Sequence, residues 1–397
     1  MRILIALPTV HPELTAVNGI VDGTIPCSGT IGSIVRLASL LTSSGVDVSL
    51  SVASEVPHSD TIVCIQHKQV DATQYDHLIV HQSHWNNTSI TFGNQALAKT
   101  VLWLQNQTSW NFIHSFLQKG GAKIVVPSMY HANIYRALKG WQDKIAVIYN
   151  SYCSVFSPVE AQTQRKLLFI GAITPTKGFT EVMQVWSYLV RQKVDLRLAI
   201  AGNIGIHRGS AAVVGPLGIA ELNFETEKIQ PWLNALSESY QPQFLGALPP
   251  IQLHEEIAQS WAVMVNPSWN SLETFCVAAV EAQACERTVF SVAAGGLKET
   301  VYAKVFGSLT SQRSIESLGD CILNGLSNID AVEQNGRSAR EYVSKRFNQQ
   351  TICQDWLNLL TGKKVEQRLP NHWSSSRDFL CDLMRWSRAG EIVGRIR

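Results

Sequence analysis

Apolar runs alternate with helical patterns along the first 150 residues of the chain. The predicted strands are Arg2–Pro8, Val46–Val52, Thr61–Ile65, His77–Gln82, Val101–Gln105, Ile124–Ser128 and Ile145–Asn150. Several are apolar at nearly every position, which is typical of strands buried on both faces of a parallel sheet. Between the first two, Thr30–Ser44 carries apolar residues at helical spacing. This alternation predicts a doubly wound α/β domain.

The alternation stops over Ser151–Arg165, a segment rich in Ser, Pro, Gln and Thr that is interpreted as a linker, and then restarts. Further strands are predicted at Leu167–Gly171, Leu196–Ala201, Gln243–Leu245, Ala262–Val265 and Val289–Val292, with helices such as Gly178–Gln192 between them and a last one at Thr351–Leu360. We expect a Rossmann-like N-terminal domain of residues 1–157, completed by 347–397, and a second of residues 158–346. Two such domains leave a cleft between them for a ligand.

Composition excludes several classes of protein. The chain has 397 residues, of which 45% are hydrophobic and 16% charged, so it is globular and long enough for two domains. A net charge of +2 gives no sign of a nucleic-acid binder. The chain has no apolar run long enough to span a membrane, enters a strand at once without a signal peptide, and has scattered cysteines without metal-binding spacing. A cytoplasmic protein with reduced thiols and no metal site is expected.

The C-terminal segment, residues 377–397, has a basic amphipathic pattern. Its apolar residues stand against five arginines, while three acidic residues dilute the charge. Such a helix either lies on a membrane surface or packs on its own protein. Peripheral membrane contact therefore stays open beside the cytoplasmic assignment.

Two carboxylates, Glu273 and Glu281, stand eight residues apart. Eight helical steps return to within about 80° of the starting direction and rise about 12 Å, so both acids can face one cleft. A helix is expected to start directly after Glu273, which leaves free N–H groups for an anion on Thr274, Phe275, Cys276 and Val277. Glu281 lies in an apolar stretch, where an unpartnered charge is costly, and a ribose diol would suit it. A buried helix that happens to hold two acids is the structural alternative.

Two other segments have residues suited to a phosphate. Phe169–Gly178 is predicted to form a strand, a turn and a helix start, where Lys177 can place a charge on a diphosphate. Cys27–Gly32 opens the first long helix, where Gly29 would let backbone approach a phosphate. A solvated lysine and an ordinary turn glycine are the structural alternatives. The pattern is not Gly-x-Gly-x-x-Gly, which argues against a dehydrogenase.

Polar residues follow two predicted strands of the N-terminal domain and end a third. His84 and Gln105 come just after or at the ends of their strands, and Asn150 ends the last one. Because ligands bind beyond the carboxyl ends of parallel strands, His84 and Gln105 are candidates for the acceptor side of the cleft. Asn150 is either a further candidate there or simple hinge structure at the end of the first domain. The His-x-x-His pair that ends at His84 has no third ligand in view, so metal binding is disfavoured.

The segments Asn266-Pro-Ser, Glu273 to Cys285 and Gly295-Gly-Leu-Lys-Glu resemble the retaining glycosyltransferases of family 4, also called glycosyl transferases group 1. The resemblance covers the chain to about residue 360 and implies the GT-B fold, whose C-terminal helix returns to the N-terminal domain. It implies that Glu273 holds sugar hydroxyls, that Glu281 holds the ribose, and that the amides of Thr274–Val277 hold the diphosphate. It also places Lys177 and Gly29 beside the donor phosphates.

The sequence departs from this family at several positions. Ala172 stands where the family has an arginine, Thr30 replaces the second glycine of the Gly-Gly loop, and Gln105 replaces a frequent histidine. A glutamine cannot titrate, so it could orient a hydroxyl but not act as a base. Glu286 replaces the glycine that closes the motif helix. Because a left-handed Glu costs about 1 kcal/mol or more, we expect that helix to end differently.

The resemblance implies transfer of a sugar from a UDP- or GDP-sugar to a hydroxyl acceptor, with retention and without metal or cofactor, since the nucleotide-diphospho-sugar is a co-substrate. Glu273 and Lys177 are the candidate catalytic residues. The acceptor could be a lipid, a glycan or a small metabolite. Two alternatives stay open: a catalytically silent binding or scaffold subunit of the same fold, and a nucleotide-sugar epimerase.

Overall fold

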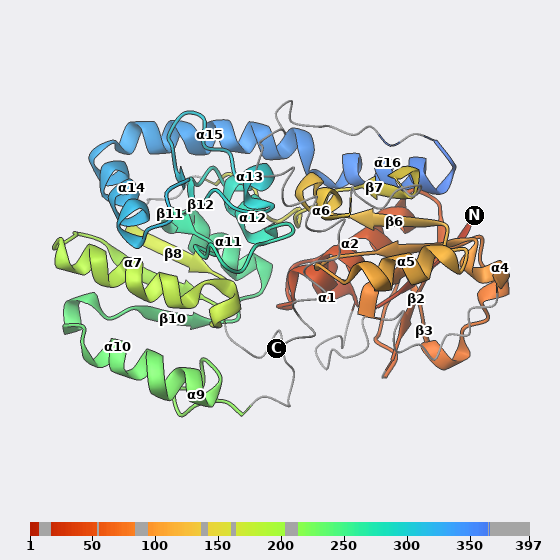
Figure 1. Ribbon diagram of the computed structural model, residues 1–397, viewed down its shortest axis with the longest axis horizontal. Coiled ribbons are helices and arrows are strands. Elements are labelled where there is room, and N and C mark those ends of the chain that lie inside the picture. Colours follow the sequence, from red (N-terminus) through yellow and green to blue (C-terminus); the bar gives the residue numbers. More distant parts are fainter. Residues whose placement is uncertain are drawn as a thin grey trace.

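Two parallel sheets with helices on their faces stand next to each other in the protein (Figure 1). The computed structural model describes residues 1–7, 17–53, 55–83, 94–135, 142–159, 164–202, 213–363 and 365. We call the part built on the first sheet the N-terminal domain and the part built on the second sheet the C-terminal domain. The predicted doubly wound architecture with two Rossmann-like halves is confirmed.

The first sheet has seven strands in the order β3-β2-β1-β4-β5-β6-β7. Their bounds are β1 Arg2–Ala6, β2 Asp47–Val52, β3 Val63–Gln66, β4 His77–His81, β5 Thr100–Trp103, β6 Lys123–Val126 and β7 Ile145–Val147. The helices of this domain are α1 Val17–Val21, α2 Gly29–Ser43, α4 Asn94–Leu97, α5 Trp110–Gln118 and α6 Met129–Ile134. Neighbouring strands are parallel throughout, as their apolar sequences predict.

The second sheet has six parallel strands in the order β10-β9-β8-β11-β12-β13. They are β8 Gln164–Ile170, β9 Arg197–Ala201, β10 Gln243–Gly246, β11 Ser260–Met264, β12 Val289–Val292 and β13 Leu309–Thr310. The helices are α7 Phe179–Arg191, α9 Leu222–Phe224, α10 Gln230–Asn234, α11 Pro250–Gln259, α12 Val277–Ala284, α13 Leu297–Thr300, α14 Ile315–Ser327, α15 Ile329–Arg346 and α16 Gln349–Leu360. Each of the twelve predicted strands is present, with ends shifted by up to three residues, whereas the two-residue β13 was not predicted.

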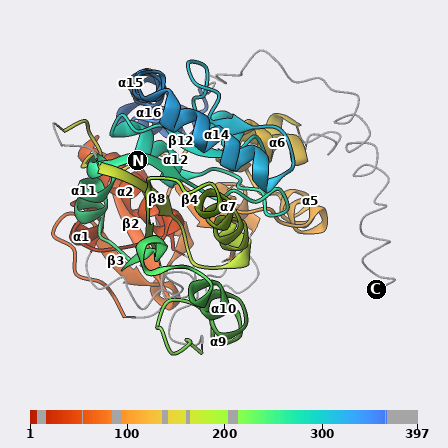
Figure 2. The same ribbon diagram turned by 90° about the vertical axis from the view of Figure 1, so that its left-hand side faces the viewer.

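The longest described helix, α15, runs along the C-terminal domain and passes the chain to α16 (Figure 1). In the view turned by 90°, α15 lies at the upper edge of the molecule and α9 and α10 lie at the lower edge (Figure 2). α16 packs against α2, and its Trp356 ring lies edge-on to Trp103 of β5 at 4.9 Å between centroids. The predicted return of the C-terminal helix to the N-terminal domain is thus confirmed. The boundary at residue 157 stays a prediction.

The chain beyond residue 365 lies outside the described residues, and so does the amphipathic pattern at 377–397. None of the described helices is both long enough and apolar enough to cross a membrane.

One buried carboxylate joins the two domains. Glu299 of α13 is 1% exposed and accepts hydrogen bonds from the backbone N–H of Met129 at 2.9 Å and of Tyr130 at 2.6 Å. A third comes from the Tyr149 hydroxyl at 3.2 Å. Burial raises the pKa of Glu299, and these donors partly offset that rise. The carboxylate therefore binds the first turn of α6 across the domain boundary.

The end of α12 corrects a prediction from the sequence. Glu286 adopts φ 59°, and the N–H groups of Glu286 and Arg287 donate to the carbonyls of Gln283 and Ala282 at 3.0 and 3.1 Å. These paired bonds are a Schellman motif, the ending that a glycine normally provides. The expectation that Glu286 would force another ending is wrong. The backbone carbonyl of Glu286 packs closely against Gly336 of α15, where an added Cβ would lie 2.1 Å from the carbonyl oxygen. This close packing holds the turn at Glu286 in its conformation.

Replacing Glu286 by glycine should stabilise the protein by about 1 kcal/mol, because it removes the steric cost of a left-handed non-glycine residue. Denaturant titration of Glu286→Gly against wild type measures the difference. Lys193→Gly, at φ 53°, should act in the same direction. Glu333→Gly inside α15 should instead lower stability by a similar amount. A loss of stability in Glu286→Gly would contradict this interpretation.

Candidate functional site

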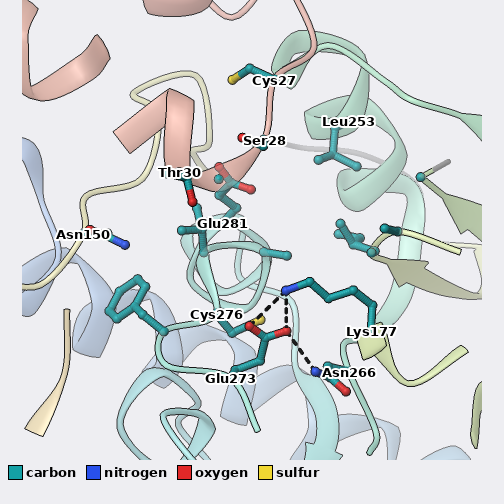
Figure 3. Close-up of a pocket in the computed structure, with 18 of the residues that line it drawn as sticks. Cys27, Ser28, Thr30, Asn150, Lys177, Leu253, Asn266, Glu273, Cys276 and Glu281 are labelled. Atoms are coloured by element: carbon teal, nitrogen blue, oxygen red, sulfur yellow. Dashed lines mark hydrogen bonds and ion pairs between the residues drawn. The ribbon is translucent and has the colours of Figure 1, made fainter. Parts of the chain in front are cut away.

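A cleft between the two domains collects almost all of the predicted site residues. Its walls include, from the N-terminal domain and the connection that follows it, Gly29, Gln105 and Asn150, and from the C-terminal domain, Lys177, Glu273, Thr274, Phe275, Cys276, Val277 and Glu281. Figure 3 shows the centre of this cleft. His84 lies outside the described residues. The carboxyl ends of β5 and β8 lie at the cleft, as expected for parallel sheets.

Lys177 and Glu273 form an ion pair in the cleft. The Lys177 Nζ lies 2.8 and 3.1 Å from the two carboxylate oxygens of Glu273, and the Asn266 side-chain N–H donates to Glu273 at 2.9 Å (Figure 3). Burial opposes the charge on Lys177, but the adjacent Glu273 carboxylate holds the pKa of Lys177 above its ordinary value. Lys177 therefore stays a cation at neutral pH.

The turn after β8 places Lys177 there. Gly178 follows it at φ 75°, and a Cβ on Gly178 would lie 2.7 Å from the Asn266 side-chain oxygen and 2.8 Å from Pro267 Cδ. Only glycine fits this backbone and this close approach. The turn can therefore lie against the loop that begins at Asn266, which brings Lys177 to Glu273.

α12 begins at Val277, three residues later than the sequence suggests. The Glu273 carbonyl accepts from the N–H of Gly296 at 2.7 Å, and the Thr274 hydroxyl donates to the Gln105 carbonyl at 2.6 Å. These long-range bonds hold Glu273 and Thr274 in a loop. Thr274 and Phe275 therefore lie outside the helix, and the prediction that their N–H groups belong to its first turn is wrong. The free donors of that turn start at Val277.

Glu281 points from α12 toward the start of α2, and its carboxylate lies near Ser28 and Thr30 (Figure 3). Burial raises the pKa of Glu281 to about 7, although the charge of Arg36 acts in the opposite direction. Within the described residues, the carboxylate makes no hydrogen bond or ion pair. An unpartnered, half-buried carboxylate of this kind suits a ligand that donates hydrogen bonds.

The starts of α2 and α12 meet at the cleft. A Cβ on Gly29 would lie 3.5 Å from a methyl group of Val277, so the first residues of the two helices are in contact distance. Both helices present unpaired N–H groups and the positive end of a helix dipole at this point. The cleft is therefore favourable for an anion.

Gln105 and Asn150 bind each other. The Gln105 amide donates to Asn150 at 3.1 Å, the Asn150 amide donates back at 2.8 Å, and both side chains are buried. This reciprocal pair joins the segment that follows β5 to the segment that follows β7, and both residues line the cleft. Their assignment to an acceptor stays a prediction.

The described residues that line the cleft include the thiol of Cys276 beside Glu273, and no cluster of metal ligands lies among them. Burial raises the pKa of Cys276 to about 12, so this thiol beside Glu273 is neutral and no nucleophile. No three His, Cys, Asp or Glu side chains gather as a metal site in the part of the chain that the structure describes.

Arg36 of α2 also lines the cleft, and the sequence did not indicate it. It is 3% exposed, and the residues one turn away on either side of it are Gly32, Ser33, Ser39 and Leu40. One signal was present: Gly32 stands four residues earlier on the same helix face, where a small residue leaves room for a long side chain.

Comparison with known proteins agrees with this geometry. The sequence profile of the family described as glycosyl transferases group 1 matches residues 154–342. The lipopolysaccharide 1,2-N-acetylglucosaminetransferase of Salmonella typhimurium is 25% identical over 314 residues, which cover 75% of this chain and 76% of the relative.

Two solved structures have the same fold over nearly the whole chain. Sucrose-phosphate synthase of Thermosynechococcus elongatus matches with a TM-score of 0.67 at 15% identity, over 91% of this chain and 98% of that chain. HepE of Anabaena in complex with UDP-glucose matches with a TM-score of 0.65 at 14% identity, over 91% and 100%. The chain is therefore a glycosyltransferase of the GT-B fold, and its residues 154–342 match the profile of the glycosyl transferases group 1.

Proposed function

We propose that the protein transfers a sugar from a UDP-sugar to a hydroxyl acceptor, with retention of the anomeric configuration and without a metal ion. The observation that carries this proposal is the Lys177–Glu273 ion pair. It lies in the same cleft as the unpartnered Glu281 and the two helix starts. A nucleotide-diphospho-sugar requires a cation and free backbone N–H groups for its phosphates, and a carboxylate that can accept hydrogen bonds from its hydroxyls.

Three parts of the donor, the ribose, the diphosphate and the sugar, have counterparts in the cleft. The ribose diol donates to Glu281, and the diphosphate lies at the starts of α2 and α12 near Lys177. The hydroxyls of the sugar donate to Glu273. As the glycosidic bond to the phosphate breaks, negative charge grows on the leaving diphosphate, and the Lys177 ammonium stabilises it.

The side chains that line the cleft are compatible with a reaction that retains the anomeric configuration. Glu273 and Glu281 are the only carboxylates among the described lining residues, and no histidine is among them. Glu273 is already held by Lys177 and Asn266. A departing phosphate oxygen that takes the acceptor proton on the same face removes the need for a separate base. Lys177 and the helix starts supply the positive charge that a metal ion supplies elsewhere.

The relatives favour particular substrates. HepE of Anabaena was solved with UDP and with UDP-glucose, and the Salmonella relative is named as a transferase of N-acetylglucosamine in lipopolysaccharide. We infer a UDP-sugar donor before a GDP-sugar, and a glycan acceptor before a lipid or a small metabolite. A cytoplasmic site of action and membrane contact through residues 377–397 stay predictions from the sequence.

Lys177→Met and Glu273→Gln should each lower transfer from a UDP-sugar about 100- to 1000-fold, since each removes a group that acts on the developing charge or the transferred sugar. Product formation with a panel of UDP- and GDP-sugars measures this, and NMR of the product reports the anomeric configuration. Lys298→Met, which removes an exposed lysine of α13, is the matched control and should leave activity unchanged.

Chelation of divalent metals by EDTA should also leave the rate unchanged. An inverted product, or loss of activity with EDTA, would contradict those parts of the proposal. Binding of UDP without transfer to any acceptor would favour the silent binding subunit.

Glu281→Gln should make the ligand-free protein more stable at pH 8 and leave it unchanged near pH 4.5. Since burial raises the pKa of Glu281 from 4.5 to about 7, its proton is bound more tightly in the folded protein. The stability that this provides is present below pH 4.5 and is lost as the pH rises through about 7. Glutamine removes that loss, and melting temperatures across this pH range measure it.

The same substitution should weaken UDP binding at least about tenfold, because a hydrogen bond to a charged group contributes about 1.5–3 kcal/mol. Glu255→Gln, at an exposed position of α11, should change neither property. A Glu281→Gln variant that binds UDP as tightly as wild type would rule out the ribose contact.

A further inference from the structure

Arg36 is a buried cation whose hydrogen-bonding groups are mostly unused. Its Nε has no hydrogen-bond partner within the described residues, and its Nη2 donates to the Ser151 carbonyl at a long 3.5 Å. No carboxylate of the described chain lies within ion-pair distance of it. Burying a charged group without a partner is costly, so such an arrangement is unusual in a purely structural role.

Gly32 determines where the guanidinium lies. Side chains on a helix lean back toward its N-terminus, so Arg36 reaches over the preceding turn of α2. A Cβ on Gly32 would lie 2.7 Å from Nη1 and 3.1 Å from Nη2 of Arg36. The missing side chain therefore leaves the space that the guanidinium fills. This places the cation one turn below the helix start, on the wall of the donor cleft.

The cleft has two described cations that could bind a diphosphate, and they differ in whether they already form an ion pair. Lys177 and Arg36 are the only lysine and arginine among the described residues that line it. Lys177 is already paired with Glu273 at 2.8 Å. Ala172, at the end of β8 on the opposite wall, adds no charge. A diphosphate brings at least two negative charges, and Arg36 is the lining cation that forms no ion pair with a described carboxylate.

We propose that Arg36 is the second phosphate-binding cation of the cleft, and that its guanidinium donates to the diphosphate of the donor from the N-terminal domain. An arginine suits this position because its planar fork can donate two parallel hydrogen bonds to a phosphate. Lys177 contacts the same group from the C-terminal domain, so the bound diphosphate joins both domains. This inference rests on the proposed function and extends it to a residue outside the C-terminal donor motifs.

Two ligands that differ only in the diphosphate, UDP and uridine, distinguish a phosphate contact of Arg36 from a structural role. Binding of UDP and of uridine to the wild-type protein and to Arg36→Gln is measured by calorimetry. Arg36→Gln should weaken UDP binding about 10- to 100-fold, the effect of losing hydrogen bonds to a charged group, and leave uridine binding unchanged. Glu281→Gln should weaken both ligands, because both carry the ribose. Arg337→Gln, at an exposed position of α15, is the matched control and should affect neither.

Two further variants make the result independent of any effect on folding. Arg36→Lys keeps the charge without the fork, so it should retain uridine binding and recover only part of the UDP affinity. Ala172→Arg, added to Arg36→Gln, should restore part of the UDP affinity from the opposite wall. Circular dichroism shows whether each variant is folded.

Equal UDP affinity in wild type and Arg36→Gln would overturn the role of Arg36 and leave the proposed function intact. An equal loss of UDP and uridine binding would assign Arg36 to the structure of the cleft and also overturn the inference. A wild-type protein that binds neither UDP nor a UDP-sugar would overturn the proposed function itself, and the inference with it.

Discussion

The hydrogen bonds of Glu299 hold the two domains in the arrangement that forms the cleft. A carboxylate that is 1% exposed would be very unfavourable at a domain boundary without partners, and it has three. Around it, Arg346 lies 5.3 Å from the centre of the Tyr149 ring and donates to the Tyr149 hydroxyl at 2.9 Å. Phe347 packs between the rings of Tyr149 and Phe275, at 5.1 and 5.3 Å. The loop that carries Glu273 and the start of α12 are therefore fixed against the N-terminal domain.

Three glutamates differ in whether the protein itself supplies hydrogen-bond donors to the carboxylate. Glu225 is fully buried and accepts from three backbone N–H groups, and Glu299 also accepts from three donors. Both are satisfied by the protein itself. Glu281 lines the cleft without a described partner, and so does the Nε of Arg36. A folded protein keeps such groups at a cost in stability, and binding of a complementary ligand removes that cost.

The sequence was sufficient for the sheets and for most of the site, and it failed where long-range contacts act. Strands buried on both faces are recognisable because each is an apolar run. The prediction that Glu273 and Glu281 face one cleft assumed that a helix starts directly after Glu273; both line the cleft, but Glu273 does so from a loop four residues before α12 begins. The later start of α12 depends on the Gly296 N–H, and the left-handed Glu286 depends on packing against Gly336. Arg36 was missed because an arginine with serines one turn before and after it on a helix is expected to be exposed to solvent, and only the fold shows that it is buried.

The Lys177–Glu273 pair connects this organisation to the proposed reaction. The Lys177 side chain is 36% exposed and that of Glu273 is 12% exposed, so solvent reaches the pair mainly from the lysine side. In the proposed complex, sugar hydroxyls contact Glu273 and phosphate contacts Lys177. The ion pair holds each of the two groups in place on the wall of the cleft. This reduces the reorganisation needed on binding, and it explains why a paired lysine and glutamate are compatible with a site for an anion.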